Sequence, residues 1–349
     1  WIEEWNAGAK EAKIWVKVPL IPANGEAKIK MYYGNPSAGA VSDGDKVFEF
    51  FDDFEGTSLD KSKWDIEIGS GGGRAEVSNG ICKVMSPNAA PSDYCRITSK
   101  KDFGINTIFI AKRMKVTTGR DLRGPMQNQG FRDDKNWITH HTEFGGESWV
   151  SWDISNNGNR YAPYKDWTDV GVSEGSWYKS GVAWYEESGV RKVAWFKNDR
   201  RDSSMNYASN DYIPTLPMSV YLSSASYSGG HDNTGYMAVD YCFVAKYTSP
   251  EPTFTLSAEQ QVITTPRPKL SPYIDIDSSL KQGEIRKGIL TVKNEGNADA
   301  KSVKVKLSSE SLEINVEKNY DKIPAGEARE FVFEVNANDA GTFKLSAYA

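Results

Sequence analysis

Residues 177–197 read WYKSGVAWYEESGVRKVAWFK, and this stretch decides the fold class. Two apolar runs, residues 177–185 and 190–196, are separated by a short polar segment that contains Ser188 and Gly189. Short apolar runs broken by Gly, Asn, Asp and Ser are typical of antiparallel strands that are joined by turns. The stretch therefore predicts two neighbouring strands of a β-sandwich.

The same pattern continues on both sides, from residue 47 to residue 259. Breaks recur at intervals of about ten residues, which is the spacing of an antiparallel sandwich. Further strands are predicted at residues 80–84, 107–114, 149–154, 218–223 and 236–247. We expect no long helix, because no stretch sustains an apolar period of 3.6 residues.

The pattern divides the chain into segments. Strand-like runs at residues 13–18 and 27–33 are too few to make a stable domain alone. The Pro-spaced stretch TTPRPK, residues 264–269, is typical of an extended linker. Alternating runs then return, and they predict a small immunoglobulin-like sandwich. The predicted segments are part of a β domain at 1–41, a jelly roll at 42–262, a linker at 263–272 and the small sandwich at 273–349.

Composition excludes several classes of protein. The 42 Lys and Arg against 47 Asp and Glu give a net charge of −5, so no basic field favours nucleic acid as a partner. No apolar run approaches the roughly 20 residues that cross a bilayer, so we expect no transmembrane segment in this chain. The three cysteines permit at most one disulfide. Whether Cys82 and Cys95, on either side of a loop, are bridged stays open.

Three short stretches near the N-terminus carry a first resemblance. The sequences WIEEWN (1–6), IWVKVP (14–19) and IKMYYGNP (29–36) resemble the end of an uncharacterised domain family. That family is common in secreted archaeal and bacterial surface proteins. The resemblance implies an extracellular or cell-surface location, and it implies that earlier strands of that domain precede Trp1.

Two further resemblances concern the rest of the chain. The stretches FDDFEGTSLD (51–60) and VDYCFV (239–244) resemble the first and last parts of a concanavalin-like jelly roll. Legume lectins, laminin-G modules and family 16 glycoside hydrolases share this fold. VKNEGNA (292–298) and IPAGE (323–327) resemble an adhesion-type immunoglobulin-like domain. The predicted fold class is all-β, a jelly-roll sandwich followed by an immunoglobulin-like sandwich.

The resemblance also directs the search for catalytic carboxylates. The related hydrolases carry Glu-x-Asp-x-Glu on one face of a strand, and the alignable stretch here is THHTEF (139–144). Only Glu143 keeps its place, and Thr139 stands where the nucleophile belongs. Because a hydroxyl without a base cannot replace that carboxylate, hydrolysis by this route is disfavoured.

A polysaccharide lyase is the alternative enzyme, since some jelly-roll lyases use His, Tyr, Arg and Gln beside a uronate. The residues that would have to converge are Arg120, Arg123, Gln127, His140, His141, Tyr178 and Lys179. The adjacent His140 and His141 point to opposite faces if they lie on a strand. Residues 177–199 are also typical of a laminin-G strand, hairpin and strand, and we favour that structural interpretation.

Aromatic side chains indicate a sugar as a ligand. Seven of the 11 tryptophans lie between residues 137 and 195, and a flat aromatic ring matches the apolar face of a sugar. Alternation sends some of these rings into the core, which leaves Trp149, Trp152 and Trp167 as surface candidates. The alternative is that all seven pack in the core or at its rim. The other candidate ligand-binding residues are Arg123, His141, Glu143 and Tyr178.

A structural calcium ion is the predicted cofactor. Resembling jelly rolls hold one ion where the opening loop meets the last strand, and position carries the ligands over to Asp53, Gly80 and Asp240. Oxygen donors suit calcium, and an aspartate in the apolar stretch VDY needs a partner if it is buried. A hydrogen-bonded Asp240 without metal is the alternative.

These observations favour a non-catalytic protein that binds a polysaccharide or a cell-surface glycan, or that serves in adhesion. Two alternatives from other classes stay open. One is a lyase or hydrolase on the concave face of the jelly roll. The other is a structural subunit of a surface layer or filament, which would self-associate through open sheet edges.

Overall fold

The computed structural model describes residues 1–35, 39, 41–88, 93–119, 125–145, 147–162, 171–226, 234–258, 266–277, 279–336 and 338–349. The chain divides into two compact units, Trp1–Phe254 and Thr255–Ala349. In the described ranges the only helix is the four-residue α1 (Gly44–Val47), and the prediction of an all-β fold is confirmed.

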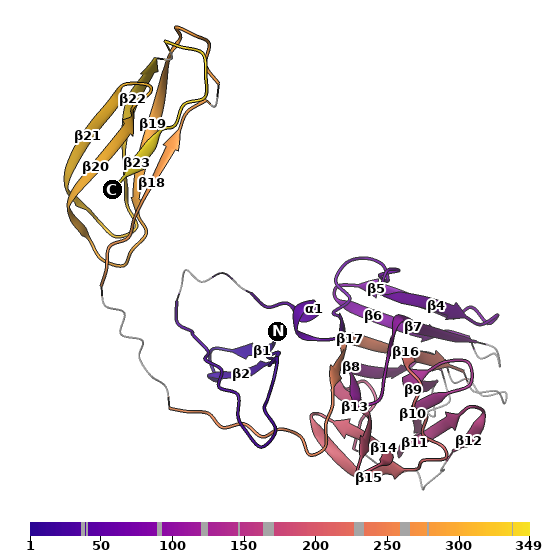
Figure 1. Cartoon of the computed structure of the whole chain (residues 1–349). Coiled ribbons are helices and arrows are strands. Elements are labelled where there is room, and N and C mark those ends of the chain that lie inside the picture. The colour runs from indigo at the N-terminus through magenta and orange to yellow at the C-terminus, as the bar shows by residue number, and fades with distance from the viewer. Residues whose placement is uncertain are drawn as a thin grey trace. The chain divides into compact units, whose positions relative to one another are not determined.

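Two antiparallel sheets make up the sandwich of the larger unit (Figure 1). The seven-stranded sheet has the order β12 (Asn159–Tyr161), β11 (Glu147–Asn156), β10 (Trp137–Gly145), β9 (Met126–Arg132), β16 (Met218–Ala225), β7 (Tyr94–Phe103), β4 (Trp64–Ile68). The eight-stranded sheet has the order β15 (Arg200–Ala208), β14 (Val190–Lys197), β13 (Tyr178–Glu187), β8 (Thr107–Thr117), β17 (Gly235–Lys246), β6 (Ile81–Ser86), β5 (Arg74–Ser78), and β3 (Phe50–Asp52) pairs with β17. Every predicted strand of this region coincides with one of these elements.

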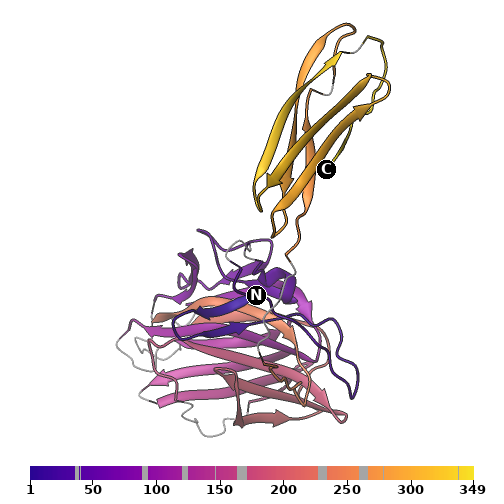
Figure 2. The ribbon, with the colours of Figure 1, turned by 90° about the vertical axis from the view of Figure 1, so that its left-hand side faces the viewer.

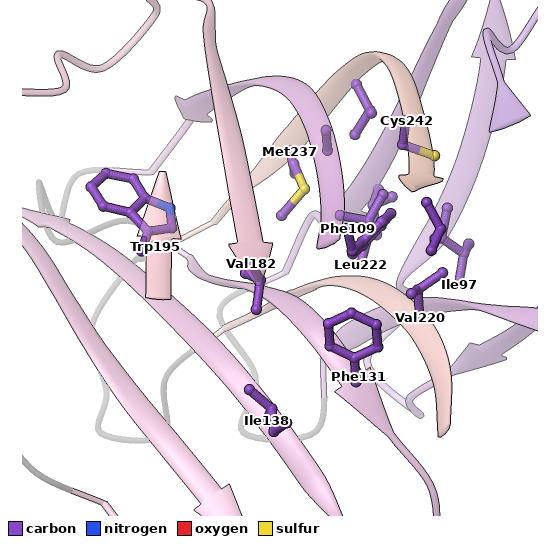
Figure 3. Close-up of a cluster of buried hydrophobic side chains, with 14 of the residues drawn as sticks. Ile97, Phe109, Phe131, Ile138, Val182, Trp195, Val220, Leu222, Met237 and Cys242 are labelled. Atoms are coloured by element: carbon purple, nitrogen blue, oxygen red, sulfur yellow. The ribbon is translucent and has the colours of Figure 1, made fainter. Parts of the chain in front are cut away.

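The apolar core fills the space between the two sheets, as expected from the period of two along each strand. Figure 3 shows part of it, with Ile138 and Phe131 from the seven-stranded sheet and Phe109 and Val182 from the other. Strand β8 illustrates the alternation: Phe109 joins this core, whereas Ile110 joins a second cluster on the opposite face of the sheet. The eight-stranded sheet is therefore apolar on both faces.

A buried hydrogen bond fixes the opening segment. The indole Nε1 of Trp64 donates to Oδ2 of Asp52 at 2.6 Å, and Asp52 lies opposite Cys242 of β17. Burial raises the pKa of the Asp52 carboxyl, although the bond from Trp64 works in the opposite direction. The start of the jelly roll is thereby attached to its last strand.

The N-terminal hairpin lies over a β-sheet of the larger unit (Figure 2), and Trp1 and Trp15 pack against the second apolar cluster. It consists of β1 (Ile2–Asn6) and β2 (Glu11–Ile14), and the Trp1 ring lies 4.9 Å from that of Tyr241. Glu3 accepts hydrogen bonds from Tyr241, Lys179 and Trp15. The predicted strand at residues 13–18 is shifted to Glu11–Ile14, and the one at 27–33 is wrong because those residues pair with no strand.

The smaller unit is a sandwich of two three-stranded sheets. One sheet has the order β18 (Leu270–Asp275), β19 (Ile285–Asn294), β22 (Ala328–Asn336), and the other β21 (Ile314–Ile323), β20 (Ala300–Ser309), β23 (Ser346–Tyr348). Apolar side chains such as Leu290, Val305 and Phe333 form its core. Its likeness to an immunoglobulin domain stays a prediction.

The state of the cysteines, which the sequence left open, is resolved. Cys82, Cys95 and Cys242 are all buried free thiols, so Cys82 and Cys95 are not bridged. Burial raises the pKa of the Cys95 thiol to about 12, which keeps it protonated. Within the described ranges we find no helix with the length and apolar character needed to cross a membrane.

Candidate functional site

The outward face of the seven-stranded sheet carries a continuous set of polar side chains. On β10, Ile138 and His140 are fully buried and face the core, so the alternating residues Trp137, Thr139 and His141 face outward. We call the outward side chains of this sheet the outer polar face. Its described members include Glu67, Tyr94, Arg96, Asn128, Arg132, Trp137, Thr139, His141, Asp153 and Tyr221.

Asp153 is the centre of one half of this face. Its carboxylate accepts hydrogen bonds from Nε and Nη2 of Arg160, at 2.8 and 2.7 Å, and from Nε1 of Trp137 at 2.9 Å. Nε2 of His141 lies 3.7 Å from Oδ2. Burial alone would raise the pKa of this carboxyl, but the bonds from His141, Arg160 and Trp137 outweigh it and hold the pKa well below its ordinary value. Asp153 therefore stays ionised and is no proton donor.

The same contacts fix two flat side chains. Nδ1 of His141 lies 2.5 Å from Oδ1 of Asn128, and the amide nitrogen of Asn128 donates to Ser223 at 3.0 Å. Because the Asn128 oxygen faces the ring, Nδ1 of His141 carries the hydrogen. Trp137, half-buried beside it, is held in place by its bond to Asp153.

Arginines and tyrosines form the other half. Glu67 accepts from Tyr94 at 2.7 Å and from Arg96 at 2.6 Å. The Arg132 guanidinium lies over the Tyr221 ring, 5.5 Å from its centroid. A depression of about 650 Å³ opens here, and it is lined by Glu67, Arg96, Thr98, Asp102, Arg132, Asp133, Asp134, Lys135, Asn136, Asn157, Leu216 and Ser219.

Thr139, which the sequence analysis compared with a hydrolase nucleophile, carries a hydrogen-bonded hydroxyl. Thr139 lies opposite Asp153 on β11 and Gly130 on β9, and its Oγ1 lies 2.5 Å from the Tyr221 hydroxyl. Both hydroxyls are buried, and burial raises the pKa of Tyr221 to about 12. Neither hydroxyl is therefore poised to attack a sugar.

The prediction that Trp152 lies on the surface is wrong. Val150, Trp152 and Ile154 form the inward face of β11, so Trp152 is buried and its Nε1 donates to the Met205 carbonyl at 2.9 Å. Trp167 and Arg123 lie outside the described residues, as do the side chains of Trp149 and Glu143. The sequence analysis did not select Trp137 or Asp153. The alternation of inward and outward residues along β10 and β11 is the signal that could have identified them.

Of the described residues of the lyase alternative, only His141 lies on this face, and Arg120 and Arg123 lie outside the described residues. Tyr178 is buried between the sheets, where its hydroxyl accepts from Arg113 at 2.8 Å, so its prediction as a residue that contacts a glycan on this face is wrong. Lys179 faces the opposite side of the eight-stranded sheet and pairs with Glu3 at 2.8 Å. Gln127 and His140 point inward. Alternation along each strand separates these side chains.

The predicted calcium residues lie around β17. Gly80 faces the backbone of Asp53, and a Cβ added to Gly80 would lie 3.9 Å from the Asp53 carbonyl oxygen. The Asp240 carboxylate pairs with Nζ of Lys112 at 2.8 Å. A cation at Asp240 would therefore have to displace Lys112. In the described part of the chain, no three His, Cys, Asp or Glu side chains cluster as a metal site.

Comparison with known proteins adds the following. Residues 1–67 match a domain of unknown function, DUF2341, which confirms an uncharacterised family at the N-terminus. No curated protein matches the chain. A β-1,3-glucanase from Mycobacterium marinum is 14% identical, with 56% of this chain and 98% of that chain covered and a TM-score of 0.43. A pseudo β-1,3-glucanase of Mycobacterium tuberculosis is 14% identical, with coverages of 58% and 99% and a TM-score of 0.39.

A third solved structure comes from work on endo-acting O-glycanases of the human gut microbiota that initiate mucin breakdown. It is 14% identical, it covers 58% of this chain and 100% of its own, and its TM-score is 0.44.

Proposed function

We propose that the larger unit binds a glycan at the outer polar face and does not cleave it. The observation that carries the proposal is the arrangement around Asp153. It orients the ring of Trp137 and leaves the edge of His141 partly exposed on the same face. A fixed aromatic ring flanked by hydrogen-bonding groups is the usual way in which proteins hold a sugar.

The chemistry of the face supports binding without hydrolysis. Glycoside hydrolysis requires one carboxylic acid that protonates the leaving group and one carboxylate that attacks or activates water. Asp153 is ionised and already accepts from Arg160 and Trp137, and position 139 holds a threonine. Since binding of an external polymer needs access to it, we also propose an extracellular location.

Retention of the whole chain on a panel of insoluble and gel-embedded polysaccharides tests this function. We expect Trp137→Ala to lower retention at least tenfold on every polysaccharide that retains the parent protein, because the stacking surface is lost. Trp177→Ala is the matched control, since Trp177 is 40% exposed at the start of a strand of the other sheet. Retention that is unchanged by Trp137→Ala, or new reducing ends in the supernatant, would overturn the proposal.

We also propose that calcium binds near β17, with Asp53, Gly80 and Asp240 as its ligands. The proximity of Gly80 to the Asp53 carbonyl oxygen supports this, and the Lys112–Asp240 ion pair opposes it. Added calcium should raise the thermal unfolding midpoint of the parent chain, and Asp240→Asn should remove that rise. A parent midpoint that responds to neither calcium nor a chelator contradicts the site.

A further inference from the structure

A buried arginine lies between the two sheets, apart from the outer polar face. Arg113 is on the inward side of β8 and has a relative exposure of 0%. No carboxylate of the described residues forms an ion pair or hydrogen bond with it. Burial of a cation is strongly unfavourable unless an opposite charge or a full set of hydrogen bonds compensates it. A compensating group is therefore required at this position.

The hydrogen bonds of Arg113 leave donors available. Its Nε donates to the Tyr178 hydroxyl at 2.8 Å, and its Nη2 donates to the Thr142 hydroxyl. Both hydroxyl oxygens act as acceptors in these bonds, so the hydrogen of each hydroxyl is free to point elsewhere. Nη1 of Arg113 has no partner. The guanidinium and the two hydroxyls thus offer hydrogens to a further group.

His140 adds another donor. It lies two residues before Thr142 on the inward side of β10, and its ring stacks on Trp195 with a centroid distance of 4.7 Å. Neither ring nitrogen has a partner. Burial and then the charge of Arg113 lower its pKa, so the ring is neutral and carries one N–H. The second ring nitrogen is an unpartnered acceptor, and so is Oε1 of Gln129, which lies opposite His140 on β9.

We propose that Arg113, Thr142, His140 and Tyr178 form a binding site for a small monovalent anion of the chloride class, enclosed between the two sheets. An anion only accepts hydrogen bonds, which matches the excess of donors, and its charge compensates that of Arg113. A water molecule could donate to the unpartnered acceptors, but it would leave the charge of the arginine uncompensated. The four side chains are all at most 5% exposed, so the ligand has to be small.

Thermal unfolding of the whole chain in sodium chloride against sodium gluconate, at equal ionic strength, tests the site. Gluconate is too large to enter, so it corrects for general salt effects. Because a ligand that binds only the folded state adds to stability by mass action, each tenfold rise in chloride above its Kd should raise the folding equilibrium constant about tenfold. Equal midpoints in the two salts at all concentrations would overturn the proposal.

Substitutions test whether the chloride dependence of stability arises at this site. Tyr178→Phe removes one donor and keeps the ring, so we expect it to fold and to weaken chloride binding about tenfold. Arg113→Met should abolish the chloride dependence if the variant folds. Arg74→Met is the matched control, because Arg74 is exposed and pairs with Glu76 at 2.6 Å. A chloride dependence that survives in Tyr178→Phe at full strength would contradict the proposal.

Discussion

The two faces of strand β10 show opposite solutions to the same problem of placing polar groups in a sheet. On the outer polar face, His141 lies beside a carboxylate and an amide oxygen, and Asp153 accepts hydrogen bonds from Trp137 and Arg160. On the inward face, His140 and Arg113 are fully buried, and atoms of both lack partners. Arg160 is 55% exposed and can exchange its partner for water, so its ion pair with Asp153 contributes little to stability. The inward groups cannot, so each unmet hydrogen bond is costly.

The largest expected effect contrasts adjacent residues of β10. Ile138→Ala should lower the free energy of unfolding by about 2–5 kcal/mol, because it leaves a cavity in a close-packed core. Thr139→Ala, on the outer polar face, should cost only about 1 kcal/mol for its hydrogen bond to Tyr221. Unfolding in urea, followed through the transition of the larger unit, measures the loss of unfolding free energy in both variants. Equal losses of unfolding free energy would mean that the inward face and the outer polar face of β10 contribute equally to stability.

The second prediction concerns acid. The folded-state pKa of His140 is lowered below its ordinary value of 6.5. Below that pH, His140 is protonated in the unfolded chain but stays neutral in the folded chain. The free energy of unfolding is therefore highest above pH 6.5 and falls as the pH drops below 6.5. His140→Gln should flatten the decline between pH 7.5 and 5, and His141→Gln should retain it. A decline that disappears only in His141→Gln would reverse the assignment.

Asp153 makes the free energy of unfolding depend on pH in a second, more acidic range. Its folded-state pKa lies below the ordinary value of 3.8, so its contribution is present above that pH and is lost as the pH falls further. Asp153→Asn should therefore reduce the pH dependence of the unfolding midpoint below about pH 4 and leave the range from pH 5 to 7.5 unchanged. Loss of the decline in the higher range would instead connect Asp153 to the titration of His140.

The smallest effect is expected for Arg160→Ala. Its guanidinium is 55% exposed, and an exposed ion pair contributes at most about 1 kcal/mol. The loss should shrink in high salt, since screening weakens surface charges. Urea unfolding at low and high salt measures it. A loss as large as that of Ile138→Ala would show that the outer polar face is as important for stability as the core.

Much of the fold followed from local pattern. The runs around 107–114, 177–185 and 190–196 are β8, β13 and β14, because period-two alternation and turn residues are local properties of the chain. The same alternation correctly separated His140 from His141. The run at 27–33 was misassigned, since a strand needs a partner and its own sequence does not provide one.

The site itself depended on registers between strands. Trp137 lies on β10, Asp153 on β11 and Arg160 on β12, and only the pairing of Trp137 with Ser155 and of Ser155 with Arg160 brings them together. A shift of one residue in any pair would send these side chains to the other face. The sequence does not state such registers, which explains why Trp152 was placed on the wrong side.

By itself, the sequence determined that the chain is built of short antiparallel strands in two sandwiches, because apolar period and turn chemistry act over a few residues. Only the tertiary structure decided that Trp137 faces outward, that Asp153 accepts from Trp137 and Arg160, and that Arg113 is enclosed with no carboxylate partner among the described residues. Those outcomes depend on contacts between residues far apart in the chain. Such contacts form only when the two sheets pack.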